Sequence, residues 1–199
     1  MSDKFQDIYR IPSARAAWWD YRNDAAYFVT ICTAGREQYF GEIANGNMHL
    51  SEIGQIAHQN WIEIPKHFPF IKLDVFVVMP NHVHGILVID HQVFCGDTVG
   101  SFPVETLHAT SLQTQPPQSI KNEALAAISP KHGSLSSVIR SYKSSVSKHV
   151  HEIHADFAWQ TRFHDHIIRD EESWKNIQEY ILTNPGRWDN DKYNDAEPM

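Results

Sequence analysis

The sequence predicts an α+β fold in which a sheet carries packed helices and a long loop is inserted between the elements. Runs of β-branched and aromatic residues, typical of strands, alternate with segments whose apolar residues recur every three or four positions, typical of helices. In chain order these segments give ββαββα. After the fourth strand the periodicity disappears over residues 91–133. These three observations define the expected architecture.

The first half of the chain predicts two strands and one helix. Residues 27–33 and 37–43 have strand composition, and Asn-Gly-Asn at 45–47 is a turn signal. Ser51 then opens a helical pattern. Its apolar positions are Ile53, Ile56, Ala57, Trp61 and Ile64. Pro65 should end this helix, because proline cannot donate a hydrogen bond to the helical ladder.

Two further strands are expected at 70–78 and 82–90, joined by a tight turn at 79–81. The second of them is rich in β-branched residues, which disfavour a helix. The segment 91–133 is rich in Gly, Pro, Ser, Thr and Gln, and this composition indicates an inserted, partly flexible loop.

Two helices complete the pattern. Ser134 can cap the first, whose apolar stripe should pack on the sheet. The stripe consists of Leu135, Val138, Ile139, Tyr142, Val146, Val150 and Ile153. The opposite face is basic and rich in hydroxyl groups, which would suit phosphate oxygens. That face carries Arg140, Lys143, Ser144, Ser147 and Lys148. The last helix is expected at about 172–182, before Asn184-Pro185-Gly186.

Length and composition predict a single domain over residues 1–199. The chain is 42% hydrophobic and 21% charged, which is ordinary for a globular protein. The core should span about 25–188, flanked by an N-terminal arm at 1–24 and an acidic tail at 189–199. A net charge of −7 argues against a protein that coats nucleic acid nonspecifically. With no signal-like or membrane-spanning apolar run, we expect a cytoplasmic protein without membrane contact.

An apolar stretch at residues 77–89, VVMPNHVHGILVI, contains two histidines. Because successive side chains of a strand point to opposite faces, His82 and His84 should emerge together on one face, with Val83 on the other. Two imidazoles placed this way can hold a divalent ion. The alternative is one packed and one exposed histidine with no ligand.

The residues Met79-Pro80-Asn81-His82-Val83-His84 resemble the histidine-hydrophobic-histidine signature of the HUH-type single-tyrosine transposases. This family includes insertion-sequence transposases and REP-associated tyrosine transposases. Further resemblance lies at 159–160, 163–169 and 180–185. The resemblance implies a ferredoxin-like antiparallel sheet with the histidines on a central strand and helices packed on one face. It also implies a bacterial protein.

In that family a tyrosine on the helix after the last core strand attacks DNA, and the residue matched to it here is Tyr142. Its position on the apolar stripe would equally suit a core tyrosine. Because the stripe should face the sheet, we expect Tyr142 to face the histidines. The resemblance therefore implies that Tyr142 is the catalytic nucleophile.

The resemblance also implies a metal centre that holds Mg²⁺ or Mn²⁺ through His82 and His84. Several relatives add an amide ligand one helical turn after the tyrosine, but Val146 occupies that position and cannot bind a metal. Water or another residue would complete the site. The candidates are His149, His164 and His166. We rank His166 first, because it matches the family pattern.

The expected function is a metal-dependent endonuclease and strand transferase that acts on single-stranded or hairpin DNA through a 5′-phosphotyrosine. Arg140, Lys143 and Lys148 are the expected DNA-binding residues. Two alternatives stay open: a hairpin DNA-binding protein that no longer cuts, and a metal-dependent phosphodiesterase without a covalent step. Relatives include monomers and dimers, so a homodimer is one expected form.

Overall fold

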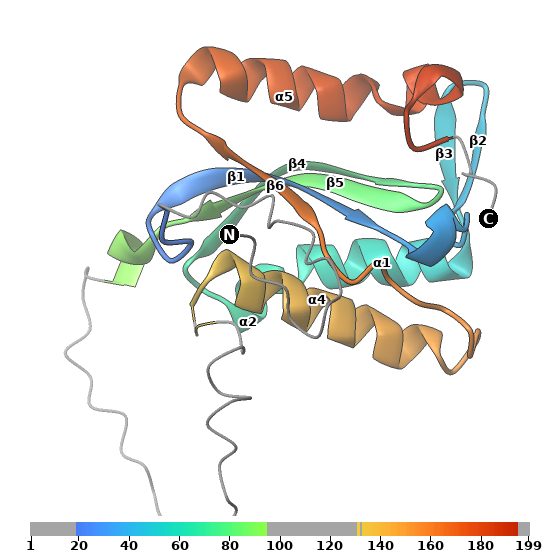
Figure 1. Cartoon of the computed structure of the whole chain (residues 1–199), viewed down its shortest axis with the longest axis horizontal. Coiled ribbons are helices and arrows are strands. Elements are labelled where there is room, and N and C mark those ends of the chain that lie inside the picture. The colour runs from blue at the N-terminus through green and yellow to red at the C-terminus, as the bar shows by residue number, and fades with distance from the viewer. Residues whose placement is uncertain (1–18, 95–130, 132, 195–199) are drawn as a thin grey trace, which may run out of the picture.

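The computed structural model describes residues 19–94, 131 and 133–194 (Figure 1). Four antiparallel strands form the main sheet, in the order β4-β5-β1-β6. Their bounds are β1 Ala25–Cys32, β4 Ile71–Met79, β5 His82–Ile89 and β6 His164–Ile168. β5 is therefore a central strand, paired on both sides.

The connections make this a split β-α-β arrangement. Helix α1, Glu52–Ile62, joins β1 to β4, and β5 lies between these two strands. Helix α4, Leu135–Val150, precedes β6, which pairs with β1 at the sheet edge. This topology is ferredoxin-like, and the expected α+β class is confirmed. β6 was not predicted, because its sequence, HDHII, has too few apolar residues to give a strand signal.

Helices cover both faces of the sheet, not one. α1 and α4 pack on one face, where a large apolar cluster includes Val83, Leu87 and Tyr142. Helix α5, Glu171–Thr183, covers the opposite face over a smaller cluster (Figure 1). That cluster contains Ile86 and Ile181. The expectation of helices on one face therefore holds for α1 and α4 only. Because α5 covers the other face, residues that point to either side of β5 are buried.

The second expected strand is part of a separate hairpin. β2, Gly41–Ala44, pairs with β3, Asn47–Leu50, through the Asn-Gly turn, and the two form their own sheet. Ser51 caps α1, since its side chain accepts a hydrogen bond from the Gly54 N–H at 3.0 Å. Pro65 lies in the first turn of α2, Ile64–His67, where a missing N–H costs nothing.

Short 3-10 segments complete the described chain: η1 at Ala34–Arg36, η2 at His91–Phe94 and η3 at Pro185–Asn190. Most of the expected loop at 91–133, the arm up to residue 18 and the last five residues of the acidic tail lie outside the described residues. Across the described ranges, every helix falls short of the length and hydropathy that crossing a membrane requires.

Candidate metal and nucleophile site

The two histidines of β5 project side by side from one face of the sheet, as predicted. Pro80 and Asn81 form a two-residue turn between Met79 and His82, which are paired in register. The imidazole centroids of His82 and His84 are 4.4 Å apart. They lie on the face that α5 covers, because Val83 belongs to the cluster on the other side.

Hydrogen bonds fix the orientation of the His82 ring. The Asn81 amide nitrogen donates to the Arg36 carbonyl at 3.0 Å and to the Tyr193 carbonyl at 2.7 Å, so its oxygen is the atom that faces His82. This oxygen lies 2.8 Å from His82 Nδ1. Because an amide oxygen only accepts, Nδ1 carries the proton and Nε2 presents a lone pair. His82 Nε2 is buried and has no hydrogen-bond partner.

His84 connects the sheet to α5. Its Nδ1 lies 2.8 Å from Thr30 Oγ1 on β1, and its Nε2 lies 3.2 Å from the hydroxyl of Tyr180 on α5. Phe28, also on β1, packs against both rings. One tyrosine hydroxyl is therefore within hydrogen-bonding distance of the histidine pair.

Burial keeps both imidazoles neutral near neutral pH. It lowers the pKa of His82 to about 3, and the positive charges of Lys192 and Arg36 act in the same direction. The pKa of His84 is also well below the ordinary value, first through burial and then through the neighbouring His82. Neutral imidazoles are the form that binds metal ions.

The C-terminal end of α5 places a second orphaned atom at the site. Asn184, one turn after Tyr180, follows the last residue of α5 and is 1% exposed. Its Nδ2 donates to Asp191 Oδ2 at 2.8 Å, whereas its Oδ1 is buried without a partner. Burial, together with the negative charge of Asp191, raises the pKa of Tyr180 to about 12.

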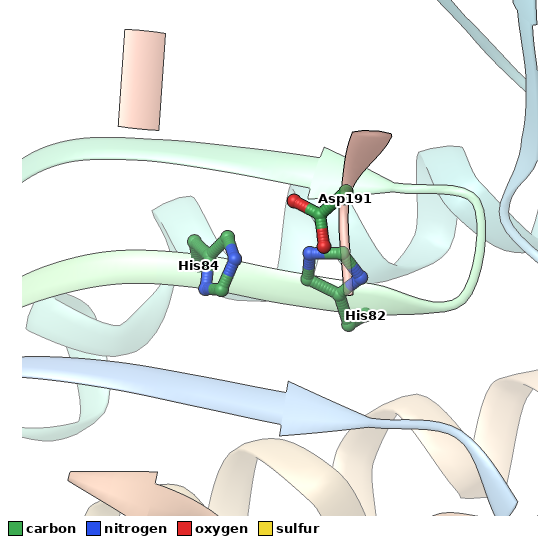
Figure 2. A group of neighbouring side chains, drawn as sticks. All are labelled: His82, His84 and Asp191. Atoms are coloured by element: carbon green, nitrogen blue, oxygen red, sulfur yellow. The ribbon is translucent and has the colours of Figure 1, made fainter. Parts of the chain in front are cut away.

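His82, His84 and Asp191 form a group that could hold a metal ion (Figure 2). One potential ligand atom from each lies within 4.8 Å of the other two. Figure 2 shows the histidines at alternate positions of one strand, with the Asp191 carboxylate beside them from the segment after η3. Buried imidazole nitrogens, an unpaired amide oxygen and a carboxylate suit a divalent cation.

A cavity of about 480 Å³ opens beside these groups, and its walls combine aromatic and positively charged side chains. They include Phe28, His164, Tyr180, Arg187, Lys192 and Tyr193. The Tyr193 ring lies 4.6 Å from the His82 ring, between centroids. The segment after η3, which belongs to the expected acidic tail at 189–199, therefore forms one wall of this cavity.

No family model matches the chain. An uncharacterized protein of Haemophilus influenzae is 36% identical over 186 residues, which cover 93% of this chain and 93% of that protein. This chain belongs to the family of that protein. The match therefore extends over nearly the whole length of both proteins.

Two solved structures resemble the fold, and both are described as transposases. One is a REP-associated tyrosine transposase bound to a REP hairpin, with a TM-score of 0.50 and 18% identity over 86% of this chain and 73% of that one. The other is a proposed transposase of Deinococcus radiodurans R1, with a TM-score of 0.41 and 13% identity over 85% and 96%. The first likeness supports the ferredoxin-like fold.

Tyr142, the expected nucleophile, is not near the histidines. Its side chain lies in the cluster under α1 and α4, on the opposite face of the sheet, with its hydroxyl donating to the Ala57 carbonyl at 3.1 Å. Its pKa is raised by burial. The stripe of α4 does face the sheet, but a sheet has two faces and the histidines occupy the other one. Val146 lies in the same cluster, so its missing ligand has no bearing on the metal group.

His166 is not in the metal group that the described residues form. It is exposed on the edge strand β6, opposite Phe28. The third member of that group is Asp191, which accepts a hydrogen bond from Asn184. The pair Tyr180 and Asn184, spaced like the tyrosine and amide of the resembled family, was the sequence signal that could have located the site.

The expected DNA-binding residues lie along α4, away from the histidines. Arg140 and Lys148 line a groove of about 440 Å³ with four serines. These are Ser137, Ser141, Ser144 and Ser145. Lys143 points elsewhere, because its Nζ donates to the Gln160 carbonyl at 2.6 Å and to the Arg162 carbonyl at 3.1 Å. Two of the three cations therefore share one surface.

Proposed function

We propose that the protein is a metal-dependent endonuclease and strand transferase for single-stranded or hairpin DNA, with Tyr180 as its nucleophile. The observation that carries this proposal is the Tyr180 hydroxyl, 3.2 Å from Nε2 of His84, whose ring lies 4.4 Å from the ring of His82 with its orphaned Nε2. The solved transposase of similar fold is bound to a hairpin. That neighbour supports the choice of hairpin DNA as substrate.

His82 and His84 would hold a divalent ion, Mg²⁺ or Mn²⁺, together with Asn184 Oδ1 or Asp191. The two unpaired buried atoms, His82 Nε2 and Asn184 Oδ1, support this ligand set, because leaving them unpaired costs free energy that a cation would recover. When bound, such an ion supplies positive charge that polarises a phosphate and favours the ionised form of a nearby phenol.

The residues of the chain then have distinct tasks. The Tyr180 hydroxyl releases its proton to solvent, and its oxygen attacks phosphorus. The bond from phosphorus to the 3′ oxygen breaks, and that oxygen takes up a proton from solvent to become a 3′-hydroxyl. The strand with the 5′ phosphate stays on the tyrosine. A second 3′-hydroxyl can reverse the reaction and join a new strand. Arg187 and Lys192, on the wall of the cavity, suit the flanking phosphates.

The basic groove of α4 is a further DNA contact in this proposal. Arg140 and Lys148 would bind phosphates of the duplex part of a hairpin, on the face of the molecule opposite the tyrosine. Lys143 is not part of this contact, since two carbonyl groups already bind its ammonium group.

Two tyrosines on opposite faces of the sheet give a matched test. Wild type, Tyr180→Phe and Tyr142→Phe are each incubated with hairpin DNA labelled at its 3′ end, with Mn²⁺ or Mg²⁺, and analysed on a denaturing gel. We expect labelled protein from wild type and Tyr142→Phe, and none from Tyr180→Phe. Tyr142→Phe loses one buried hydrogen bond, so it should lose roughly 1 kcal/mol of stability and keep its activity.

The other outcomes separate the alternatives. An adduct from Tyr180→Phe but not from Tyr142→Phe would restore Tyr142 as nucleophile. Binding without adduct or cleavage in the wild type would indicate a hairpin-binding protein. Cleavage without adduct, unchanged in both variants, would indicate a phosphodiesterase that uses water.

A further inference from the structure

Helix α5 carries Tyr180 and ends just before Asn184, and a small apolar cluster attaches it to the sheet. All residues of α5 are described, and Ile181 is the one that is fully buried. Around it lies a small apolar cluster on the sheet. Apolar contacts are non-directional, so such a cluster attaches the helix without fixing its rotation or its position along its axis.

A carboxylate on the sheet supplies the missing direction. Trp174 Nε1 donates to Asp74 Oδ2 at 2.6 Å, and Gln178 Nε2 donates to Oδ2 at 2.8 Å and to Oδ1 at 3.1 Å. Trp174 and Gln178 are one helical turn apart, so they lie on the same side of α5. One side chain of β4 is therefore bonded to two successive turns of the helix, just before Tyr180.

An irregularity in β4 places Asp74 and the next residue, Val75, on the same face of the sheet, which α5 covers. The pairing of β4 with β5 shifts register between Leu73 and Phe76, and these two residues pack in the cluster on the α1 and α4 face. Val75 packs in the α5 cluster, and its neighbour Asp74 reaches α5 as well. Two consecutive side chains share a face only where regular alternation is broken. The Val75 N–H then donates to Asp74 Oδ1 at 2.8 Å and holds the carboxylate in place.

We propose that Asp74 is a positioning residue, which sets the rotation and axial position of α5 and so brings the Tyr180 hydroxyl to His84. This inference rests on the proposed function of Tyr180. Asp74 touches neither the histidines nor the cavity in the described structure; it acts through Trp174 and Gln178.

The test compares Asp74→Ala with Asp74→Asn in the full chain. Alanine removes the acceptor for both helix donors. Asparagine keeps an oxygen for Trp174 and lets the Gln178 amide turn its own oxygen to the new donor, and it gives up only the bond from the Val75 N–H. With saturating 3′-labelled hairpin DNA and Mn²⁺, we expect Asp74→Ala to form adduct about 100-fold more slowly, the scale of a misplacement of about 1 Å. Asp74→Asn should recover most of this loss, and DNA affinity should change little in either variant.

Glu171→Gln is the matched control, because it breaks an exposed ion pair to Lys175 on the same helix and should leave the rate unchanged. If Asp74→Ala does not fold, Gln178→Ala replaces it and should slow the reaction in the same direction. An unslowed rate in the alanine variant used, or a weaker DNA affinity that explains the whole effect, would overturn the positioning role.

A second readout separates this inference from the proposed function. Hydrogen exchange of α5 amides should accelerate in Asp74→Ala, with strands β1 and β5 unaffected. If wild type forms no adduct, the proposed function fails, and exchange alone decides whether Asp74 holds the helix. Equal hydrogen-exchange rates of the α5 amides in wild type and Asp74→Ala would show that Asp74 does not hold the helix.

Discussion

His82 combines complete burial with a nitrogen that has no partner. Asn81 fixes its tautomer, and Tyr193 covers its ring, so the lone pair of Nε2 is held towards His84 and Asp191. An unpaired buried nitrogen normally destabilises a protein. A fold that keeps such a nitrogen indicates that the atom has a function, such as binding a ligand.

We expect Mn²⁺ to stabilise the wild type against heat and to have no such effect on His82→Ala. A ligand that binds only the folded state adds about 2.7 kcal/mol at one hundred times its dissociation constant. The measurement is thermal unfolding with and without Mn²⁺. Removing a buried ring will lower the baseline stability of His82→Ala, so the metal-induced shift is the relevant quantity.

His166→Ala is the control, since this exposed histidine lies outside the metal group of the described residues. It should keep the full metal-induced shift. A shift lost in His166→Ala and kept in His82→Ala would assign the metal to β6 instead.

At the scale of residues, the sequence predicts which side chains of one strand lie together better than it predicts a group assembled from distant segments. The period of a strand is enough to put His82 and His84 on one face, because it depends on local geometry alone. Asp191 reaches them only because α5 and η3 return the chain to β5, and no local pattern contains that return. The four-residue spacing of Tyr180 and Asn184 is visible in the sequence. Tyr142, however, lies on a more regular apolar stripe, and that pattern favoured it in the sequence analysis.

Among the elements, β5 shows how tightly the layers fit. A Cβ atom on Gly85 would lie 2.4 Å from Trp61 Cζ2 of α1 and 3.0 Å from Phe76 Cβ of β4. Glycine at this position, directly after His84, therefore lets α1 pack closely against β5.

Gly85→Ala should destabilise the protein by roughly 1–3 kcal/mol, the usual cost of overpacking a core. Urea unfolding measures it. Gly186→Ala is the control, because a Cβ there would meet no atom within 4 Å, and its unfolding midpoint should stay near that of the wild type. Equal midpoints for the two variants would mean that α1 can move away from β5 at little cost.

The groove of α4 gives a prediction about binding. Arg140→Gln combined with Lys148→Gln should reduce the salt dependence of hairpin binding by about one unit of slope for each lost phosphate contact. The adduct rate at saturating DNA should not change, because α4 and α5 lie on opposite faces of the sheet. Binding curves at several salt concentrations provide the slope, and an unchanged slope would show that DNA does not touch this groove.

For the molecule as a whole, two neutral buried histidines make stability depend on pH. In the unfolded chain both titrate near the ordinary value of about 6.5. In the folded chain the pKa of His82 is about 3, and that of His84 is also well below its ordinary value, through burial. Below about pH 6.5 the unfolded chain therefore binds protons that the folded chain does not, and stability falls as the pH falls.

We expect the metal-free protein to lose up to about 1.4 kcal/mol per pH unit and per histidine as the pH drops from about 6.5 towards about 4. Urea unfolding across this range measures how the free energy of unfolding changes with pH. His84→Gln should reduce this pH dependence by the contribution of one histidine. If wild type and variant have the same slope, His84 is already charged in the folded protein.

For the whole molecule, the α+β class could be predicted from the sequence, but the distribution of the helices over the two sheet faces could not. Alternating patterns and the order ββαββα led to an α+β sheet, since strand and helix periods are local properties. The position of α5 on the opposite face was not predicted, and for this reason Tyr142, rather than Tyr180, was expected beside the histidines. A helical stripe says that a helix is covered, but it does not say which of two sheet faces covers it.

The candidate site joins the middle of the chain to its last described residues: His82 and His84 come from β5, whereas Tyr180, Asn184 and Asp191 follow roughly a hundred residues later. During synthesis the histidines leave the ribosome long before the residues that complete the site. A growing chain therefore holds the histidine pair before Tyr180, Asn184 and Asp191 are made. A truncated product that stops before residue 180 would keep the histidine pair and lack the proposed nucleophile, so under the proposed function it would form no DNA adduct.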